Sequence, residues 1–431
     1  MFLQPGSPPL FENESNNYWK IVWDILDEAQ EYATEHRDRI PEDMSLRDWL
    51  DQYVGAHQSE DPEGEKYMSK LMKMAVHGLA MYWADENAIP MEKVSMKYMD
   101  AEDVFPGEHS LVTNGYDRMV KALTSQLKDA RVLLEHVVDK IEYSESEVKV
   151  STNHGTFTAD EVLVTLPLGV LKSQSSSLFS PVLPISKQHA INNLGFGTMF
   201  KIFLFFPTCF WPEDKHFINF LPSSFTKQPN AKLVSRFNLN SRQVEALTVY
   251  MQDLANYSSF MPVYNKPILV GYATNQAAEL MERLSDEEAR MVYICQLSHY
   301  YDILLSNKPD QGESLWPKVS FMSRWNQDPF ARGSYTSIPV GASTSDIEEF
   351  QIPVTARAYG TLVGDDDYEH CDIESNLVDP SVAVLTSVND TEGGRVFFAG
   401  EHTSSGHFAS VQGALMSGRL AAAKILGQYL I

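Results

Sequence analysis

The stretch Arg395-Val-Phe-Phe-Ala-Gly-Glu-His402, continued by Ser410-Val-Gln-Gly-Ala-Leu-Met-Ser-Gly418, carries the clearest structural pattern in the chain. Its Val-Phe-Phe run predicts a buried strand, and Gly400 lets another group approach the backbone at the end of that strand. Glu401 follows at the carboxyl end, where open α/β sheets place their ligands. From Val411 a helix is predicted, whose first amides have no partner within the helix. This order of elements suits a ligand with hydroxyl groups and an electron-rich edge.

Three further motifs precede this stretch: Val162-Leu-Val-Thr-Leu-Pro-Leu-Gly-Val-Leu-Lys172, Leu194-Gly-Phe-Gly-Thr-Met-Phe-Lys201 and Ser323-Arg-Trp-Asn-Gln-Asp-Pro-Phe-Ala-Arg-Gly-Ser-Tyr335. The last stretch alone would also suit an ordinary final strand and helix of an α/β domain. Together, the four ordered motifs resemble the flavin amine oxidase family, which includes polyamine oxidases, monoamine oxidases and lysine-specific histone demethylases. The resemblance implies FAD as the cofactor, since a flavin has both the hydroxyl groups and the electron-rich edge.

The resemblance implies roles for residues near the flavin ring. Lys201 matches the lysine that holds a water against flavin N5, although a lysine at a sheet edge whose charge reaches water is the simpler alternative. Glu401, after Gly400, would accept hydrogen bonds from the ribityl hydroxyls. The Val411 amide would stabilise charge at the N1 and C2 carbonyl edge. Ser410 stands where amine oxidases often carry a tyrosine.

Four more positions correspond to cofactor or substrate contacts in the family. Val138 matches the residue whose backbone pairs with adenine, and Thr165 lies where the Thr-Leu-Pro strand end approaches the cofactor. Trp325 would pack beside the isoalloxazine, with a core tryptophan as the competing interpretation. Tyr335 matches an aromatic residue that faces the substrate.

The helical segment that contains Asp85 and Glu86 corresponds to the wall of the amine channel in the family. These carboxylates would steer a cationic substrate, although each could equally lie at a solvated helix end. The formal net charge of −24 argues against nucleic acid as the main ligand and would attract cations.

The fold class expected is α/β, with an incomplete FAD-binding Rossmann-like domain interleaved with an α+β substrate-binding domain. The FAD-binding segments are 108–194 and 350–431. The substrate domain consists of a helical part, 1–107, and a mixed-sheet part, 195–349.

Local patterns predict individual elements. Ser45 and Asp48 form a capping-box pattern before a helix. Residues 133–143 are expected to form a strand and residues 286–304 a helix. Residues 210–260 are poorly patterned, so a loop-rich region is predicted there.

The glycine fingerprint of dinucleotide-binding domains, Gly-x-Gly-x-x-Gly, does not occur in the sequence, and Gly195-Phe-Gly197 is the nearest match. In the family this fingerprint lies N-terminal to the region that residue 1 matches. The expectation is therefore a truncated chain that binds FAD weakly or not at all, because the pyrophosphate-binding helix terminus is missing.

The expected function is FAD-dependent oxidation of a small cationic amine, above all a polyamine, with O2 reoxidising the flavin to give H2O2. The alternatives are a histone lysine demethylase-like oxidase, disfavoured because no long heptad hairpin is present, and a non-catalytic binding protein. No signal peptide, membrane-length apolar run or peroxisomal tripeptide occurs, so a cytoplasmic location is expected. The three cysteines show no metal pattern, and the sequence does not indicate the oligomeric state.

Overall fold

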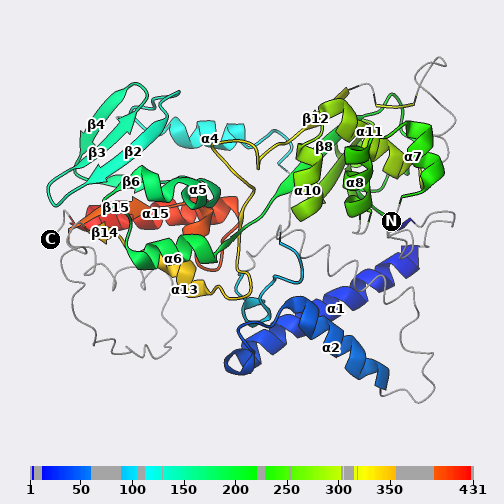
Figure 1. Cartoon of the computed structure of the whole chain (residues 1–431), viewed down its shortest axis with the longest axis horizontal. Helices are drawn as coiled ribbons and strands as arrows, with labels where there is room; N and C mark the ends of the chain where they lie inside the picture. The colour runs from blue at the N-terminus through cyan, green and yellow to red at the C-terminus, as the bar shows by residue number, and fades with distance from the viewer. Residues whose placement is uncertain are drawn as a thin grey trace.

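The computed structural model describes residues 2–3, 12–59, 89–103, 112–128, 130–220, 229–251, 255–301, 304, 315–317, 319–355 and 393–428. The described elements gather into a helical part, a part built on a six-stranded sheet, and an α/β part that holds the C-terminal helix (Figure 1).

Two long helices, α1 (Glu12–His36) and α2 (Leu46–Ser59), dominate the helical part. The predicted capping box at the start of α2 is confirmed: the Asp48 amide donates to Ser45 Oγ, and the Asp48 carboxylate accepts from the Ser45 amide at 3.0 Å. A bridge between Ser45 and Ser95 connects the start of α2 with the segment around Ser95, and a bridge between Val94 and Pro339 joins that segment to Pro339. The helices therefore have fixed connections to the rest of the protein.

The six-stranded sheet has the order β1-β9-β10-β11-β8-β12. All its pairs are antiparallel except β1 with β9. The strands are β1 (Phe2–Leu3), β9 (Phe217–Phe220), β10 (Ala255–Ser259), β11 (Ile268–Thr274), β8 (Met199–Phe205) and β12 (Val319–Met322). Helices α8 (Ser241–Tyr250), α10 (Asn275–Glu282) and α11 (Asp286–Leu297) pack on one face of this sheet (Figure 1).

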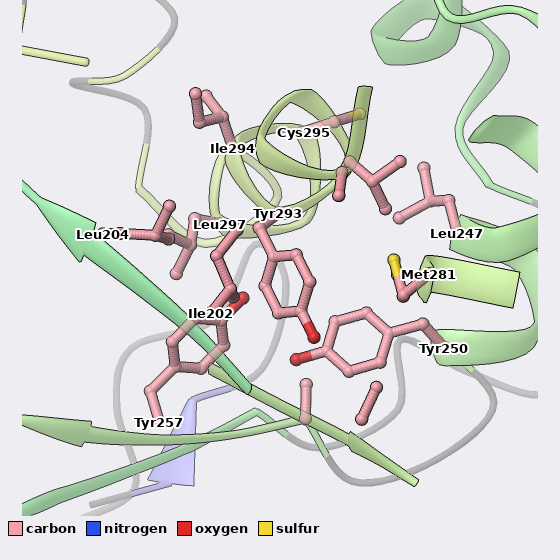
Figure 2. Packing of buried hydrophobic residues seen from close by; sticks show 14 of the residues in the cluster. Ile202, Leu204, Leu247, Tyr250, Tyr257, Met281, Tyr293, Ile294, Cys295 and Leu297 are labelled. Atoms are coloured by element: carbon pink, nitrogen blue, oxygen red, sulfur yellow. The ribbon is translucent and has the colours of Figure 1, made fainter. Parts of the chain in front are cut away.

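Alternation along the strands separates the two faces of this sheet. Figure 2 shows Ile202 and Leu204 of β8 pointing into the same core as Tyr257, Tyr250 and Tyr293. The tyrosines are almost fully buried. The strand neighbours of Ile202, Leu204 and Tyr257 consequently point to the opposite face of the sheet.

The prediction of a loop-rich region over 210–260 is wrong. The region holds β9, β10, α8 and α7 (Ala231–Phe237). The helix boundaries depend on asparagines: Asn238 ends α7 in the left-handed conformation, and Asn240 begins α8 in a capping box with Gln243. Single asparagines at helix ends determine where the helices stop and start, but they do not add to the periodic spacing of apolar residues that predicts a helix. The sequence pattern of this region is therefore weak.

Helix α11 is shorter than predicted, since it ends at Leu297 rather than at 304. Tyr300 and Tyr301 follow in a turn, and both rings pack against Phe220, with centroids 4.4 and 6.1 Å away. This aromatic packing takes the place of another helical turn.

The α/β part contains a small sheet in the order β14-β15-β5, with β14 (Val354–Thr355), β15 (Gly394–Phe398) and β5 (Val162–Val164). β15 and β5 are parallel. However, Leu163 is 37% exposed, so β5 is less covered than a strand buried on both faces. Helix α15 (Val411–Gln428) follows β15, and the sheet also contacts helices α5 (Leu168–Leu178), α6 (Ile185–Asn193) and α13 (Thr344–Glu349).

A four-stranded sheet, β4-β3-β2-β6, lies beside it (Figure 1). Its strands are β2 (Val138–Tyr143), β3 (Val148–Thr152), β4 (Gly155–Ala159) and β6 (Phe179–Ser180). The predicted strand over 133–143 begins five residues late, because a turn occupies the positions before it. The short helix α4 (Asp117–Thr124) has no buried residue. The described elements also include α9 (Met261–Tyr264), the two-stranded pair β7 (Gly195–Phe196) with β13 (Thr336–Ser337), and the 3₁₀ turns η1 (Arg37–Arg39) and η2 (Met96–Tyr98).

Candidate functional site

The motif that ends at Lys201 and the motif that ends at Tyr335 lie side by side. β7 pairs with β13, the Gly197 amide donates to the Tyr335 carbonyl at 2.9 Å, and the Ser334 amide donates to the Gly197 carbonyl at 2.7 Å. Two segments more than a hundred residues apart in sequence thus form one continuous ladder.

Lys201 lies on β8, an inner strand between β11 and β12, so the alternative of an edge lysine is wrong. Its amide donates to Ser323 Oγ at 2.8 Å, which brings the Trp325 segment alongside. Its Nζ lies 5.5 Å from the centroid of the Tyr272 ring. Burial lowers the pKa of Lys201. No carboxylate forms a salt bridge with it in the part of the chain that the structure describes. The ammonium form is therefore less stabilised than that of a surface lysine.

Glu401 joins the ladder to helix α15. It begins a short 3₁₀ turn, η5 (Glu401–Thr403), which follows β15 after Ala399 and Gly400. One carboxylate oxygen accepts from Thr336 Oγ1 at 2.8 Å, and the other accepts from the Ala409 amide at 2.7 Å. Burial raises the pKa of Glu401, and these hydrogen bonds to the ionised form oppose that rise. The carboxylate is thus held in a fixed orientation by protein donors.

The start of α15 presents free backbone donors. Ser410 Oγ accepts from the Gly413 amide at 3.0 Å, which is the geometry of a helix N-cap. The amides of Val411 and Gln412 have no hydrogen-bond partner among the described residues. Two free amides at the positive end of a helix dipole suit an electron-rich group. The chemistry here therefore fits the edge of a flavin ring, beside a carboxylate with acceptor capacity left for hydroxyl groups.

The structure adds His402, which sequence reasoning missed. It is 1% exposed, burial lowers its pKa to about 3, and its ring meets Phe350 edge-on at 4.9 Å. A Cβ placed on Gly400, whose φ is +146°, would lie 2.7 Å from the imidazole. A glycine is therefore required at this strand end by the neutral histidine behind it, and the Gly-Glu-His order is the sequence signal for this packing.

The other predicted site residues differ in how far they are buried. Trp325 is 49% exposed, so its interpretation as a core residue is wrong, and Tyr335 is partly buried in the ladder. Val138 begins β2 opposite Thr152, and Thr165 is exposed directly after β5.

The acidic pair predicted to steer the amine, Asp85 and Glu86, lies outside the described residues. The structure thus brings together Lys201, Trp325 and Tyr335 on one side and Glu401, Ser410 and Val411 on the other, joined through Thr336.

A known protein family matches almost the whole chain. The family described as flavin containing amine oxidoreductase matches residues 16–426. The chain belongs to this family.

The names of curated relatives of this chain give more than one activity. The chain is 31% identical over 363 residues to "Possible lysine-specific histone demethylase 1" of Drosophila melanogaster, covering 80% of this chain and 33% of the relative. It is 32% identical to "Polyamine oxidase 2" of Arabidopsis thaliana, covering 78% and 52%. The chain therefore spans between a third and about half the length of these relatives.

A solved structure of putrescine oxidase superposes with a TM-score of 0.58 at 17% identity, covering 97% of this chain and 77% of that one. This likeness shows that the mixed α/β architecture is the amine oxidase fold.

Neither a metal-binding cluster nor a membrane-spanning helix is found among the described residues. No group of three or more His, Cys, Asp or Glu side chains there could hold a metal ion. No helix in the described ranges is long and apolar enough to cross a membrane.

Proposed function

We propose that this chain supplies the flavin-ring and substrate side of an FAD-dependent amine oxidase. The observation that carries the proposal is the ladder that joins Lys201 through Thr336 and Glu401 to the free amides at the start of α15. FAD would accept a hydride from the carbon next to the substrate nitrogen and pass the electrons to O2.

The protein residues would hold and orient this chemistry. Glu401 would accept hydrogen bonds from ribityl hydroxyls, and the Val411 amide would donate to the electron-rich ring edge. Gly400 would let the cofactor come close to the strand end, and Trp325 would cover the ring. Lys201, partly buried and without a salt bridge in the described part of the chain, would hold a water at the reacting face.

The remaining cofactor and domain assignments rest on family resemblance. Val138 and Thr165 would lie on the adenine side of FAD. Segments 108–194 and 350–431 would form the FAD-binding domain, interleaved with a substrate domain from 1–107 and 195–349.

Binding of FAD by this chain alone is proposed to be weak, because the sequence holds no glycine fingerprint. The test is to purify the 431-residue chain and measure flavin absorbance after desalting. Stoichiometric yellow protein would contradict weak binding, whereas colourless protein that gains flavin only at high FAD concentration would support it.

The substrate we propose is a polyamine. The net charge of −24 favours cations, one relative is named a polyamine oxidase, and Tyr335 and the proposed acidic pair Asp85 and Glu86 would line the amine path. The reacting nitrogen must be neutral to release a hydride, so activity at limiting substrate should rise with pH.

Histone lysine demethylation is the second candidate. Relatives at about the same identity are named demethylases, and Ser410 replaces the tyrosine often found in amine oxidases. Measuring H2O2 release from spermine, spermidine, their acetylated forms, an aromatic monoamine and a methylated histone peptide separates the candidates. Preference for the peptide would favour the second candidate, and release from none of them with FAD bound would favour a non-catalytic binding protein.

A further inference from the structure

A cleft of about 560 Å³ lies where the three parts of the protein meet. The helical part contributes Lys93, the α/β part contributes Asn192 in the last turn of α6, and the part with the six-stranded sheet contributes Gln276 at the start of α10. Neither Lys201 nor Glu401 is among the described residues that line the cleft. The cleft is therefore separate from the proposed flavin site.

The start of α10 offers backbone donors to this cleft. The helix begins after Thr274, whose side chain makes no capping hydrogen bond. Asn275 has a φ of +51°, and its amide donates to the Thr198 carbonyl at 3.0 Å. The next two amides, of Gln276 and Ala277, have no hydrogen-bond partner among the described residues. Such amides lie at the positive end of the helix dipole, so they favour an anionic group.

Ser337 on β13 is a second, independent indication of a ligand. It lines the cleft and is 4% exposed, and its hydroxyl oxygen has no hydrogen-bond partner among the described residues. Buried hydroxyl groups usually have a partner. This hydroxyl lies against Gly195, another residue of the cleft wall, because a Cβ placed on Gly195 would be 2.3 Å from the oxygen. A ligand in the cleft could therefore accept the proton that Ser337 has to donate.

The charged and amide side chains of the wall indicate which ligand these donors suit. Lys93 is exposed and forms no salt bridge with any described residue. Glu279 also lines the cleft, but it lies 3.7 Å from Arg283, which offsets its charge. The side-chain amides of Asn192 and Gln276 add neutral N–H donors. The net charge of −24 disfavours anions at long range, so these neighbouring donors would have to hold one.

The number of donors and the volume of the cleft narrow the ligand class. A phosphate group has more acceptor oxygens than a carboxylate, and lysine side chains and helix N-termini commonly bind it. The volume lies within the range of about 300–1,000 Å³ typical of small-molecule sites, and Pro90, Phe196 and Pro339 give the wall an apolar side. We infer that this cleft binds a phosphomonoester with an apolar body, whose phosphate is held by Lys93, Ser337 and the first amides of α10.

Calorimetry on the 431-residue chain without FAD tests the inference, using phenyl phosphate, inorganic phosphate and phenol as probes. Phenyl phosphate should bind more tightly than inorganic phosphate, and phenol should give no measurable binding. A hydrogen bond to a charged group is worth about tenfold or more in affinity, so Lys93→Met should weaken phenyl phosphate binding by at least about tenfold.

Ser337→Ala separates a ligand contact from a structural role. It should weaken phenyl phosphate binding by about threefold to tenfold. The free energy of unfolding in urea should not fall in this variant, because the hydroxyl has no partner to lose. A fall in stability without a change in affinity would show a structural role and overturn the assignment of Ser337.

The matched control is Lys266→Met, which changes an exposed lysine before the start of β11, at the opposite end of that strand from Asn275. It should leave the affinity for phenyl phosphate unchanged. The inference would be overturned if the unmutated chain bound no phenyl phosphate or bound it no better than inorganic phosphate. Affinity that survives Lys93→Met would also overturn it, since the anion would then lie elsewhere, such as at the free amides of α15. These measurements involve no amine oxidation, so their failure would leave the proposed function untouched.

Discussion

Replacing Glu401 tests whether the site is held together as described. In Glu401→Ala the amides of Ala409 and Thr336, 2.7 and 3.3 Å from the carboxylate, lose their acceptor, as does the Thr336 hydroxyl at 2.8 Å. Hydroxyl groups can turn towards other acceptors, so the main cost comes from two partly buried amides. At about 1–3 kcal/mol for each unsatisfied group, the free energy of unfolding should fall by about 3 kcal/mol.

Glu401→Gln separates hydrogen bonding from charge. Its oxygen can keep the two amides while its NH2 group donates to the Thr336 hydroxyl, so the loss should be only about 1 kcal/mol. Urea unfolding followed by circular dichroism measures both values, with the exposed residue Glu348 changed to alanine as the matched control. A loss in Glu401→Ala no larger than that in Glu348→Ala would refute the proposed link between β13 and α15.

The charge of Glu401 also makes a pH prediction. Its pKa is raised by burial, so the folded protein holds this proton to higher pH than the unfolded chain does. The contribution of Glu401 to stability therefore falls as pH rises through the interval just above 4.5. The difference in unfolding free energy between the unmutated chain and Glu401→Gln should shift in that direction across the interval.

Three further changes have defined outcomes. Lys201→Met, in an FAD-loaded form, should slow flavin reduction or reoxidation in stopped-flow measurements while FAD stays bound, and unchanged half-reactions would reject its role. Lys187→Met leaves the Ile352 carbonyl without its donor at 2.9 Å, so unfolding in urea should become easier by about 2 kcal/mol. Burial lowers the pKa of Lys187 to about 8, so between pH 8 and 10.5 the folded protein binds fewer protons at this lysine than the unfolded chain does. The free energy of unfolding of the unmutated chain should therefore rise relative to that of Lys187→Met across this interval. Hydrogen bonds from Ser285 hold the pKa of Glu288 at about 2. Glu288→Gln should therefore lower the free energy of unfolding above pH 4.5, and this loss should disappear as the pH falls towards 2. An equal loss at both pH values would contradict the prediction.

Local signals predicted the parts of the fold that depend on neighbours in sequence. An apolar run predicts the strand before Glu401, and the change to a helical period of apolar residues predicts the helix after Ser410. The Ser45 capping box follows from the three-residue separation of Ser45 and Asp48. The region 210–260 was misjudged because its helix ends depend on Asn238 and Asn240, whose signals are single residues.

The contacts that organise the site could not be predicted in the same way. Thr336 is 65 residues from its partner Glu401, and nothing in either local pattern indicates the pairing. The face on which Lys201 lies depends on the register of β8 with β11, which sets Lys201 opposite Tyr272, and a shift of one residue would turn Lys201 into the core. Family resemblance supplied Lys201 and Glu401, but only the strand order shows that Lys201 occupies an inner strand.

Helix α4 has no buried residue, so it should unfold locally more easily than the buried helices do. An eight-residue helix is marginal on its own in water, and here no tertiary burial adds to its stability. Its backbone amides should therefore exchange with deuterium among the fastest in the described helices, well before those of α11, whose apolar residues are buried. Met119, Val120 and Leu123 on α4 are exposed, so any molecule that covers them should slow this exchange. The deuterium exchange rate of residues 117–124 thus reports whether another molecule contacts the exposed apolar side chains of α4.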